Sequence, residues 1–389
     1  GAAEVEGESR LISYSSSKQI NRVNAVSLTG LEAGATYYYQ VGDGSVWSEV
    51  RSFTVPAAEK QTRFFLLADI QEEAALEGMG RIANHLAGQY PFGVQLGDAV
   101  DNVRYYNQWE DALSLFTLDG IRNTDMIHVI GNHEADDGGN NAIAAKSVFG
   151  VPAAWYSVER GDVYIAVLNH TSDKDTLQQF TQWLVEDAAR STCTWKVLVT
   201  HVPAYYTNPT GGGETYVQYL PAACDAAGID FYFSGNDHSY ARTMVLKNGQ
   251  PVSEAAQNGR LPATYGKGVL YYICGDLGEK SRSTEYKAVN NPDFHFAQVS
   301  QEYDSLYLAV EATADAMTVR TYSVSAEGAQ SLLDTYTMRV PASVCRDKGH
   351  DFSGDTVYVR DGKLVCSFCG QTVELKDSGY WVENTNLNG

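Results

Sequence analysis

The stretch Met126–Glu134, "MIHVIGNHE", joins a largely apolar run to a turn of polar residues. A short apolar run bounded by a turn residue predicts a strand that is buried on both faces. Asn132, His133 and Glu134 follow directly where this strand ends. Because amide, carboxylate and imidazole groups bind divalent cations, the stretch predicts ligands at the end of a buried strand.

The same pattern recurs along the chain. Six further apolar runs are "RFFLLAD" (63–69), "FGVQLGD" (92–98), "DVYIAVLNH" (162–170), "WKVLVTH" (195–201), "IDFYFSG" (229–235) and "GVLYYICGD" (268–276). Helical patterns occupy 72–89 and 176–189, and the runs 305–313 and 316–323 form a hairpin-like pair. Strands that alternate with helices predict a layered α/β domain, which we place at residues 62–340.

Polar side chains gather at the ends of five of these strands. They are Asp69, Gln71, Asp98, Asn132, His133, Glu134, His201, Asn236, Asp237 and His238. In open α/β sheets the carboxyl ends of the strands meet at the ligand crevice, so we expect these groups to converge. The mixture of oxygen and imidazole donors suits divalent Mn, Fe or Zn.

Composition narrows the range of partners. The 389 residues carry a net charge of −20, and neither a basic stripe nor a polybasic block is present. This excludes nucleic acid and anionic membranes as expected partners, whereas bound cations would still allow a phosphorylated small molecule. No apolar run is long enough to predict a membrane span. The chain opens on Gly1 without Met, so we expect a removed leader and an extracellular or cell-surface location.

Two shorter segments flank the α/β domain. Residues 1–56 show short alternating strands with a turn at Gly42-Asp43-Gly44, which predicts a small β-sandwich, either incomplete or completed by residues outside this sequence. The predicted linker is 55–61. Residues 341–389 contain Cys345, His350, Cys366 and Cys369. This spacing predicts one structural zinc in a ribbon-like segment. A Cys366–Cys369 disulfide and unpaired thiols are the alternatives.

The order of the strand-end blocks resembles that of the calcineurin-like metallophosphoesterases. The blocks are Asp69-Ile-Gln71, Gly97-Asp98-Ala-Val-Asp101, Gly131-Asn-His-Glu134, His201 and Gly235-Asn-Asp-His238. Within that family the chain is similar to the purple acid phosphatase branch, which has an N-terminal fibronectin-III-like domain. "LTGLEAGATYYYQVGDG" (28–44) resembles that domain, and the whole resemblance covers about residues 10–340.

The resemblance implies two adjacent active-site metals, drawn from Fe, Mn or Zn. Asp98 would bridge them, Asp69 and His238 would complete the first position, and Asn132, His201 and Asn236 would hold the second. His133 would be the general acid or a hydrogen-bond donor to the leaving group. The implied reaction is attack of a metal-bound hydroxide on a phosphomonoester, or on a diester.

Three residues depart from the family pattern. Gln71 replaces a histidine, Asp101 stands where the purple enzymes have a tyrosine, and Asn236 replaces the first histidine of the G-H-x-H block. An asparagine carbonyl is a weaker donor than imidazole toward zinc or iron. Natural drift and a deliberate substitution would both give this pattern. The rival hypothesis is therefore a metal-impaired pseudoenzyme that binds a ligand or serves in surface adhesion.

Other residues near the blocks have secondary roles in this interpretation. Glu134 is expected to orient a neighbouring imidazole, and Gln71, Asp101 and Asp237 to lie close to the metals. Arg242 and Arg104 are candidates for phosphate contact. The remaining histidines, which are His85, His128, His170 and His295, are interpreted as structural or surface residues. The Gly-rich stretch "TGGGETY" (210–216) predicts a mobile loop near the cleft.

Overall fold

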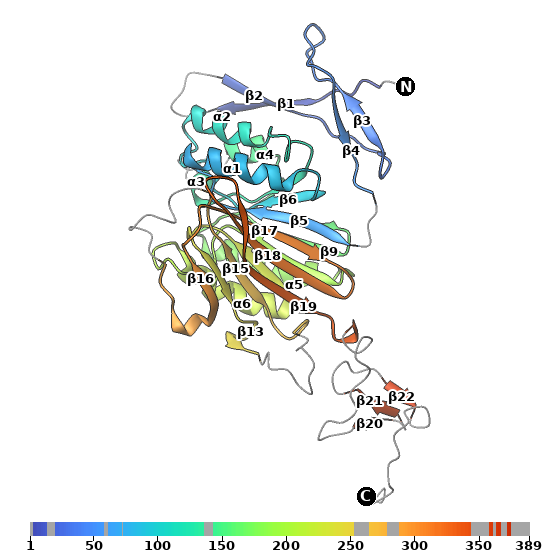
Figure 1. The fold of residues 1–389 in the computed structure, drawn as a ribbon, viewed down its shortest axis with the longest axis vertical. Coiled ribbons are helices and arrows are strands. Elements are labelled where there is room, and N and C mark those ends of the chain that lie inside the picture. Colours follow the sequence, from blue (N-terminus) through green and yellow to red (C-terminus); the bar gives the residue numbers. More distant parts are fainter. Residues whose placement is uncertain are drawn as a thin grey trace, which may run out of the picture. The chain divides into compact units, whose positions relative to one another are not determined.

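The computed structural model describes residues 3–13, 20–57, 61–71, 73–135, 143–252, 264–277, 288–343, 358–360, 363–366 and 372–374. The chain divides into two compact units, residues 1–252 with 266–337 and residues 253–265 with 338–389. The larger unit contains two sheets and the helices that cover them (Figure 1). Among the described residues, no helix is both long and apolar enough to cross a membrane.

A six-stranded sheet has the order β19-β18-β17-β5-β6-β7. Its strands are β5 (Thr62–Leu67), β6 (Phe92–Gln95), β7 (Asp125–His128), β17 (Ser305–Ala312), β18 (Ala316–Val324) and β19 (Gln330–Arg339). β5, β6 and β7 run parallel, and β17 pairs antiparallel with both β5 and β18. The predicted hairpin-like pair at 305–323 is thereby confirmed.

A seven-stranded sheet has the order β16-β12-β15-β11-β10-β9-β8. Its strands are β8 (Trp155–Arg160), β9 (Val163–Leu168), β10 (Trp195–Thr200), β11 (Phe231–Ser234), β12 (Tyr240–Thr243), β15 (Leu270–Cys274) and β16 (Phe296–Ser300). The four central strands β9, β10, β11 and β15 are parallel. A small β13 (Leu246–Lys247) and β14 (Gln250–Pro251) pair lies outside it.

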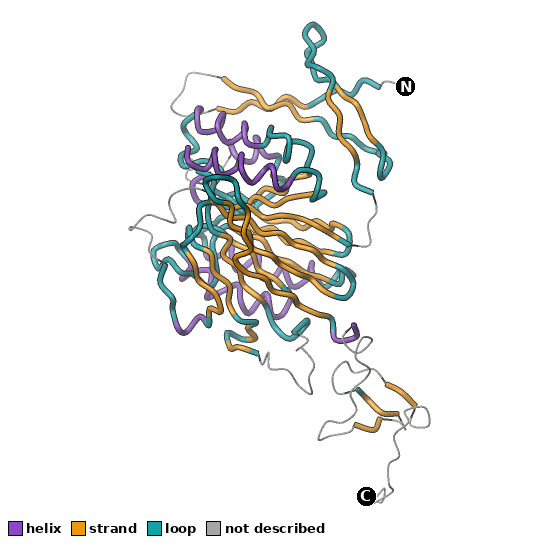
Figure 2. The backbone as a smooth tube through the Cα atoms, viewed as in Figure 1, coloured by secondary structure: helices purple, strands orange, loops and turns teal. Residues whose placement is uncertain are grey.

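Helices cover the outer faces of both sheets, which form the middle layers of the unit (Figure 2). They are α1 (Glu73–Leu86), α2 (Tyr106–Leu115), α3 (Asn132–Ala135), α4 (Ile143–Phe149), α5 (Lys174–Ala188), α6 (Gly213–Ala227) and the 3-10 turn η3 (Pro292–Phe294). Met79 and Ile82 of α1 pack with Phe65 of β5. Leu177 and Phe180 of α5 pack in the same way on the seven-stranded sheet. The predicted apolar faces of both helices are confirmed.

Burial on both faces explains why the core strands read as continuous apolar runs. Phe65 and Leu67 contact the helical layer, while the alternate residues Phe64 and Leu66 are also completely buried. Side chains alternate between the faces of a strand, so both faces of β5 need apolar residues. This confirms the predicted layered α/β fold and sets the parallel strands with their carboxyl ends at one edge of each sheet.

The flanking segments contain only short strands in the described part of the chain. β1 (Glu8–Ser13) pairs with β2 (Ile20–Ala25), and β3 (Thr36–Tyr39) pairs with β4 (Arg51–Thr54). Near the other end, β20 (Tyr358–Arg360), β21 (Lys363–Val365) and β22 (Thr372–Glu374) form an antiparallel sheet. Cys366 is buried, whereas Cys345, His350 and Cys369 lie outside the described residues, so the zinc site stays a prediction.

Candidate metal centre

The candidate site is built from turns that follow parallel strands of both sheets. Asp69, Asp98, Asn236 and His238 have φ angles of 50°, 54°, 69° and 49°. This left-handed conformation is uncommon outside glycine, and asparagine, aspartate and histidine adopt it most readily. Only Asn248 and His295 share it among the other described non-glycine residues. The concentration of strained backbone at these strand ends marks a functional site.

Three donor atoms converge at the junction of the two sheets. His201 Nε2 lies 3.1 Å from Asp98 Oδ2 and 2.9 Å from Asn132 Oδ1. His201 Nδ1 lies 2.8 Å from the Leu96 carbonyl oxygen, which can only accept, so Nδ1 carries a proton. Nε2 therefore faces two acceptor oxygens. Asp69, Asp98 and His201 together form a buried group that could hold a metal ion.

The pKa shifts of His201 and Asp69 indicate that this buried cluster favours a bound positive charge. Burial alone lowers the pKa of His201, but Asp98 outweighs it and raises the pKa to about 10. Burial raises the pKa of Asp69 to about 6, against the attraction of His238 and His201. The His201 ring thus needs either a proton or a cation between Nε2 and the facing oxygens. The donor set fits a divalent ion, which would take the place of that proton.

A second imidazole adjoins Asp69. His238 Nε2 lies 3.8 Å from Asp69 Oδ1, and His238 Nδ1 lies 3.4 Å from Asp276 Oδ2. A carboxylate that accepts one ring N–H fixes the tautomer and turns the other nitrogen toward a metal. Sequence reasoning missed Asp276, although it ends the apolar run 268–276 just as Asp98 ends the run 92–98.

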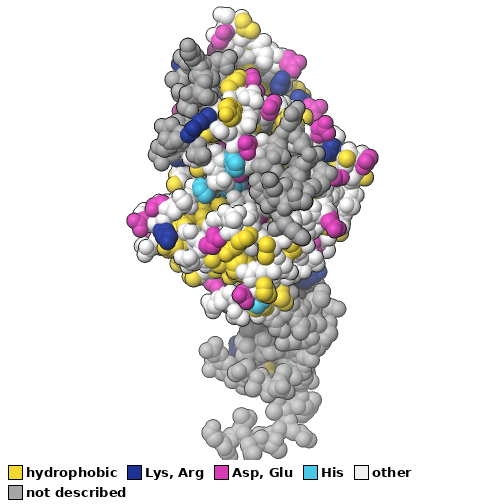
Figure 3. All heavy atoms as spheres, turned by 90° about the vertical axis from the view of Figure 1, so that its left-hand side faces the viewer, with side chains coloured by type: hydrophobic (Ala, Val, Ile, Leu, Met, Phe, Trp, Pro, Cys, Tyr) yellow, Lys and Arg dark blue, Asp and Glu magenta, His cyan; other side chains and the backbone are white. Residues whose placement is uncertain are grey.

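His133 lies at the rim of the site. Its Nδ1 lies 2.5 Å from the Asp101 carbonyl oxygen, and its Nε2 lies 3.8 Å from Asp98 Oδ2. The side chains of His133 and Asp101 keep 31% and 46% of their surface exposed. Figure 3 shows histidine and acidic atoms reaching the surface of the molecule on one face. His133 is thus accessible to solvent, whereas the His201 ring is completely buried.

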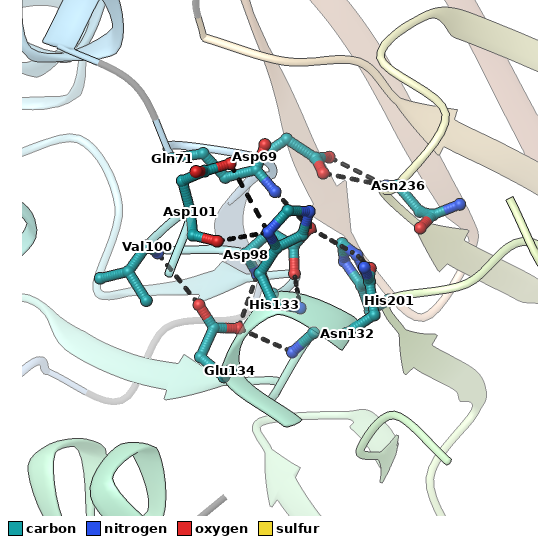
Figure 4. Close-up of polar contacts among 12 residues, drawn as sticks. Asp69, Gln71, Asp98, Val100, Asp101, Asn132, His133, Glu134, His201 and Asn236 are labelled. Atoms are coloured by element: carbon teal, nitrogen blue, oxygen red, sulfur yellow. Dashed lines mark hydrogen bonds and ion pairs between the residues drawn. The ribbon is translucent and has the colours of Figure 1, made fainter. Parts of the chain in front are cut away.

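Glu134 ties together the turns that carry the ligands. Its Oε2 accepts from the backbone N–H of Asp98 and of Gly131, both at 2.8 Å, and its Oε1 accepts from Val100 N at 3.0 Å. Figure 4 shows this carboxylate beneath the Asp98 turn. Glu134 thus binds backbone amides, whereas we expected it to orient an imidazole. Burial, with repulsion from Asp98, raises the pKa of Glu134 to about 7.

Asp237 ties a different loop to the site. Its Oδ2 accepts from Thr207 N at 2.6 Å, from Asn208 N at 2.9 Å and from Thr207 Oγ1 at 3.1 Å. Asn236 Nδ2 donates to the Gly211 carbonyl oxygen at 3.0 Å. The stretch 210–216 differs from the predicted mobile loop, because α6 already begins at Gly213 and Gly211 is bonded to Asn236.

The remaining candidates take varied positions. Gln71 lies within the cluster, where its Nε2 donates to Asp98 Oδ2 at 2.5 Å. Arg242 is buried against Asp334, with Nε 2.7 Å from Asp334 Oδ2, and its guanidinium stacks over Tyr336. Arg104 is exposed. The buried ring of His128 stacks on Phe149, and His85 Nε2 lies 3.1 Å from the Gly328 carbonyl oxygen, in keeping with structural roles.

Comparison with known proteins defines the class first. Residues 62–240 match the family model of the calcineurin-like phosphoesterases, and residues 2–55 match that of the purple acid phosphatase N-terminal domain. Residues 62–240 are thus a calcineurin-like phosphoesterase domain, preceded by an N-terminal domain of the purple acid phosphatase type. This confirms the resemblance seen in the strand-end blocks.

Individual relatives agree with this placement. Purple acid phosphatase 22 of Arabidopsis thaliana is 25% identical over 64% of this chain and 58% of its own length. Fe(3+)-Zn(2+) purple acid phosphatase 12 of the same plant is also 25% identical, over 64% and 57%. The structure of purple acid phosphatase PPD1 from yellow lupin has a TM-score of 0.71 at 16% identity, over 86% and 66%, and so shares the fold. The chain spans under three fifths of the length of the two curated relatives.

Proposed function

We propose that this chain is a metal-dependent phosphoesterase that hydrolyses phosphomonoesters or phosphodiesters at a dinuclear centre. The observation that carries the proposal is the convergence of Asp98, Asn132 and His201 from both sheets beside Asp69 and His238. Membership of a family whose relatives are named phosphatases supports it. When bound, the two metals would supply charge neutralisation and an activated water for in-line attack on phosphorus.

The assignment of ligands to the two metal positions combines the family resemblance with the donor atoms present. We assign Asp98 to both positions, Asp69 and His238 to the first, and Asn132, His201 and Asn236 to the second. The Leu96 carbonyl and Asp276 fix the two imidazoles so that Nε2 of each faces a ligand carboxylate. A relative named as an Fe(3+)-Zn(2+) enzyme supports a centre of two ions.

His133 is the proposed donor to the leaving group. The Asp101 carbonyl oxygen accepts from Nδ1, so Nε2 can give up a proton only when both ring nitrogens are protonated. Asp101 Oδ1 lies 3.6 Å from the same Nδ1. His133 then protonates the departing alkoxide, and the bond from its backbone N–H to Asp98 Oδ1, at 3.1 Å, holds α3 beside the proposed metal ligands.

The flanking segments complete the proposal. We assign residues 1–56 to a fibronectin-III-like domain, 62–340 to the phosphoesterase domain, and 341–389 to a zinc-ribbon-like segment that holds one structural zinc. We also propose an extracellular or cell-surface location. None of these assignments alters the chemistry at the strand ends.

Hydrolysis of p-nitrophenyl phosphate, an alkyl phosphate and bis-p-nitrophenyl phosphate tests the function, with manganese, zinc or iron added. We expect turnover of the monoesters that Asp98→Ala abolishes. His133→Ala should cost about 10²- to 10⁴-fold on the alkyl phosphate and less on p-nitrophenyl phosphate, whose leaving group needs little protonation. An equal loss on both monoesters would remove His133 as the acid.

The rival function is a metal-impaired pseudoenzyme, and Asn236 in place of an imidazole is the observation that favours it. Absence of turnover with every metal, in a protein that still binds inorganic phosphate, would establish a ligand-binding protein in place of the enzyme.

A further inference from the structure

Asn236 is held at the site by both its backbone and its side chain. Its backbone N–H donates to Asp69 Oδ2 at 2.9 Å and to Oδ1 at 3.2 Å. Its side-chain Nδ2 donates to the Gly211 carbonyl oxygen and to Asp237 Oδ1, both at 3.0 Å. A carbonyl and a carboxylate only accept, so the amide nitrogen, and not the oxygen, must face them.

This anchoring fixes the direction of the Asn236 carbonyl oxygen. Figure 4 shows the amide nitrogen turned away from Asp98 and His201 and the oxygen nearer to them. Within the part of the chain that the structure describes, no hydrogen bond reaches this oxygen, although both hydrogens of the amide have acceptors. An oriented and unbonded carbonyl oxygen beside buried carboxylates is a ready ligand for a cation.

The two donor sets are therefore rich in oxygen. The second position has oxygens of Asp98, Asn132 and Asn236 and a single imidazole, His201. The first has Asp69, Asp98 and His238, again a single imidazole. Carboxylate, carbonyl and water ligands suit manganese, whereas imidazole favours zinc and iron.

We propose that Asn236 is an oxygen ligand held in place by the 207–211 loop, and that it makes the second position select manganese over zinc. The inference rests on the metal centre proposed above. Gly211 is part of the device, because a Cβ added there would lie 2.5 Å from Asn236 Nδ2 and 3.0 Å from Asp237 Oδ1. The loop thus controls the ligand by holding its amide nitrogen.

The test uses the full chain, stripped with a chelator and titrated with manganese under electron paramagnetic resonance. Wild type should take up two ions as a spin-coupled pair. Asn236→Ala should lower the affinity for the second ion by roughly a hundredfold. Gly211→Ala, which keeps the Asn236 side chain but displaces its amide nitrogen, should lower that affinity by about tenfold. Thermal unfolding of the apo variants verifies that they are folded.

Competition with zinc measures the selectivity. In Asn236→His, zinc should displace the second manganese at a concentration about tenfold lower than in wild type, or lower still. Asn236→Asp, which keeps an oxygen donor, should retain the preference for manganese. The proposal is overturned if Asn236→Ala still binds the coupled pair with unchanged affinity, or if Asn236→His leaves the competition unchanged. A coupled pair without phosphatase turnover would support this inference and refute the proposed function.

Discussion

Glu134 and Asp237 are two buried carboxylates that both accept backbone hydrogen bonds, Glu134 in α3 after β7 and Asp237 in the turn after β11. Glu134 accepts two hydrogen bonds from the Asp98 turn and one from Gly131 of its own segment, whereas Asp237 accepts three from Thr207 and Asn208. They differ in how those bonds are shared. Glu134 uses both oxygens for backbone amides, whereas Asp237 uses Oδ2 for the whole loop and leaves Oδ1 to the Asn236 amide.

The difference decides what each residue controls. Glu134 joins the Asp98 turn to Gly131, so it positions two segments that carry proposed ligands. Asp237 joins the Asn236 segment to Thr207 and Asn208, which carry none. Glu134 therefore positions two ligand-bearing turns directly, whereas Asp237 holds the 207–208 loop and, through Oδ1, the amide of the single proposed ligand Asn236.

Glu134→Gln should have the largest effect. An amide has only one accepting oxygen, so its NH₂ group must face at least one backbone N–H of Asp98, Gly131 or Val100. We expect a loss of about 2 kcal/mol in unfolding free energy, since an unsatisfied buried donor costs about 1–3 kcal/mol. Manganese affinity should fall at least tenfold, by the reasoning that outer hydrogen-bond partners of ligands matter about 10–100-fold.

Urea unfolding of the apo protein and a manganese titration measure the two effects of Glu134→Gln. Unchanged manganese affinity together with lowered stability would show that Glu134 supports the fold alone.

Asp237→Asn should lower the free energy of unfolding by a smaller amount, about 1 kcal/mol. The asparagine oxygen can take the position of Oδ2, and only the contact with the Asn236 amide becomes a clash of two donors. Hydrogen exchange at Thr207 and Asn208 should rise modestly, which mass spectrometry of the loop peptides can follow. A loss in unfolding free energy equal to that of Glu134→Gln would contradict the difference proposed between the two carboxylates.

Asp230, a buried carboxylate at the opposite end of β11, is a control for both Glu134 and Asp237. It also accepts a backbone bond, from Lys196 N at 3.0 Å, but it lies at the amino end of the strand. Burial raises the pKa of Asp230 to about 7 from its ordinary 3.8. The folded protein therefore holds this proton more tightly, and the contribution to stability is lost as pH rises through 7.

Asp230→Asn removes that titration. We expect the variant to be within about 1 kcal/mol of wild type at pH 5, to gain on it up to about pH 7 and to level off above that, because each pKa unit is worth about 1.4 kcal/mol. Phosphatase activity should not change. Thermal unfolding at four pH values checks the trend, and a difference that is constant with pH would contradict it.

The strand ends could be predicted from the sequence because each core strand is a local signal. An apolar run that stops at Asp98 or His201 needs no knowledge of partners, and the parallel order of strands then brings the ends together. The helix faces of 72–89 and 176–189 were predictable for the same reason.

Contacts between distant segments were not predictable in this way. The bond between Arg242 and Asp334 joins residues 92 positions apart, and no local pattern distinguishes this arginine from one that binds phosphate. The role of Asp237 depends on a loop that precedes α6, and the Gly-rich sequence there suggested mobility. Asp276 had a local signal, the end of an apolar run, but it lies outside the family blocks that guided the assignment.

The left-handed turns at Asp69, Asp98, Asn236 and His238 have a consequence for how this centre can evolve. Such backbone admits mainly glycine, asparagine, aspartate and histidine, and three of these four are metal-binding side chains. A replacement of one ligand by another at these positions therefore leaves the backbone undisturbed. Lineages can exchange imidazole for oxygen one residue at a time and so adapt the centre to the metals their surroundings supply.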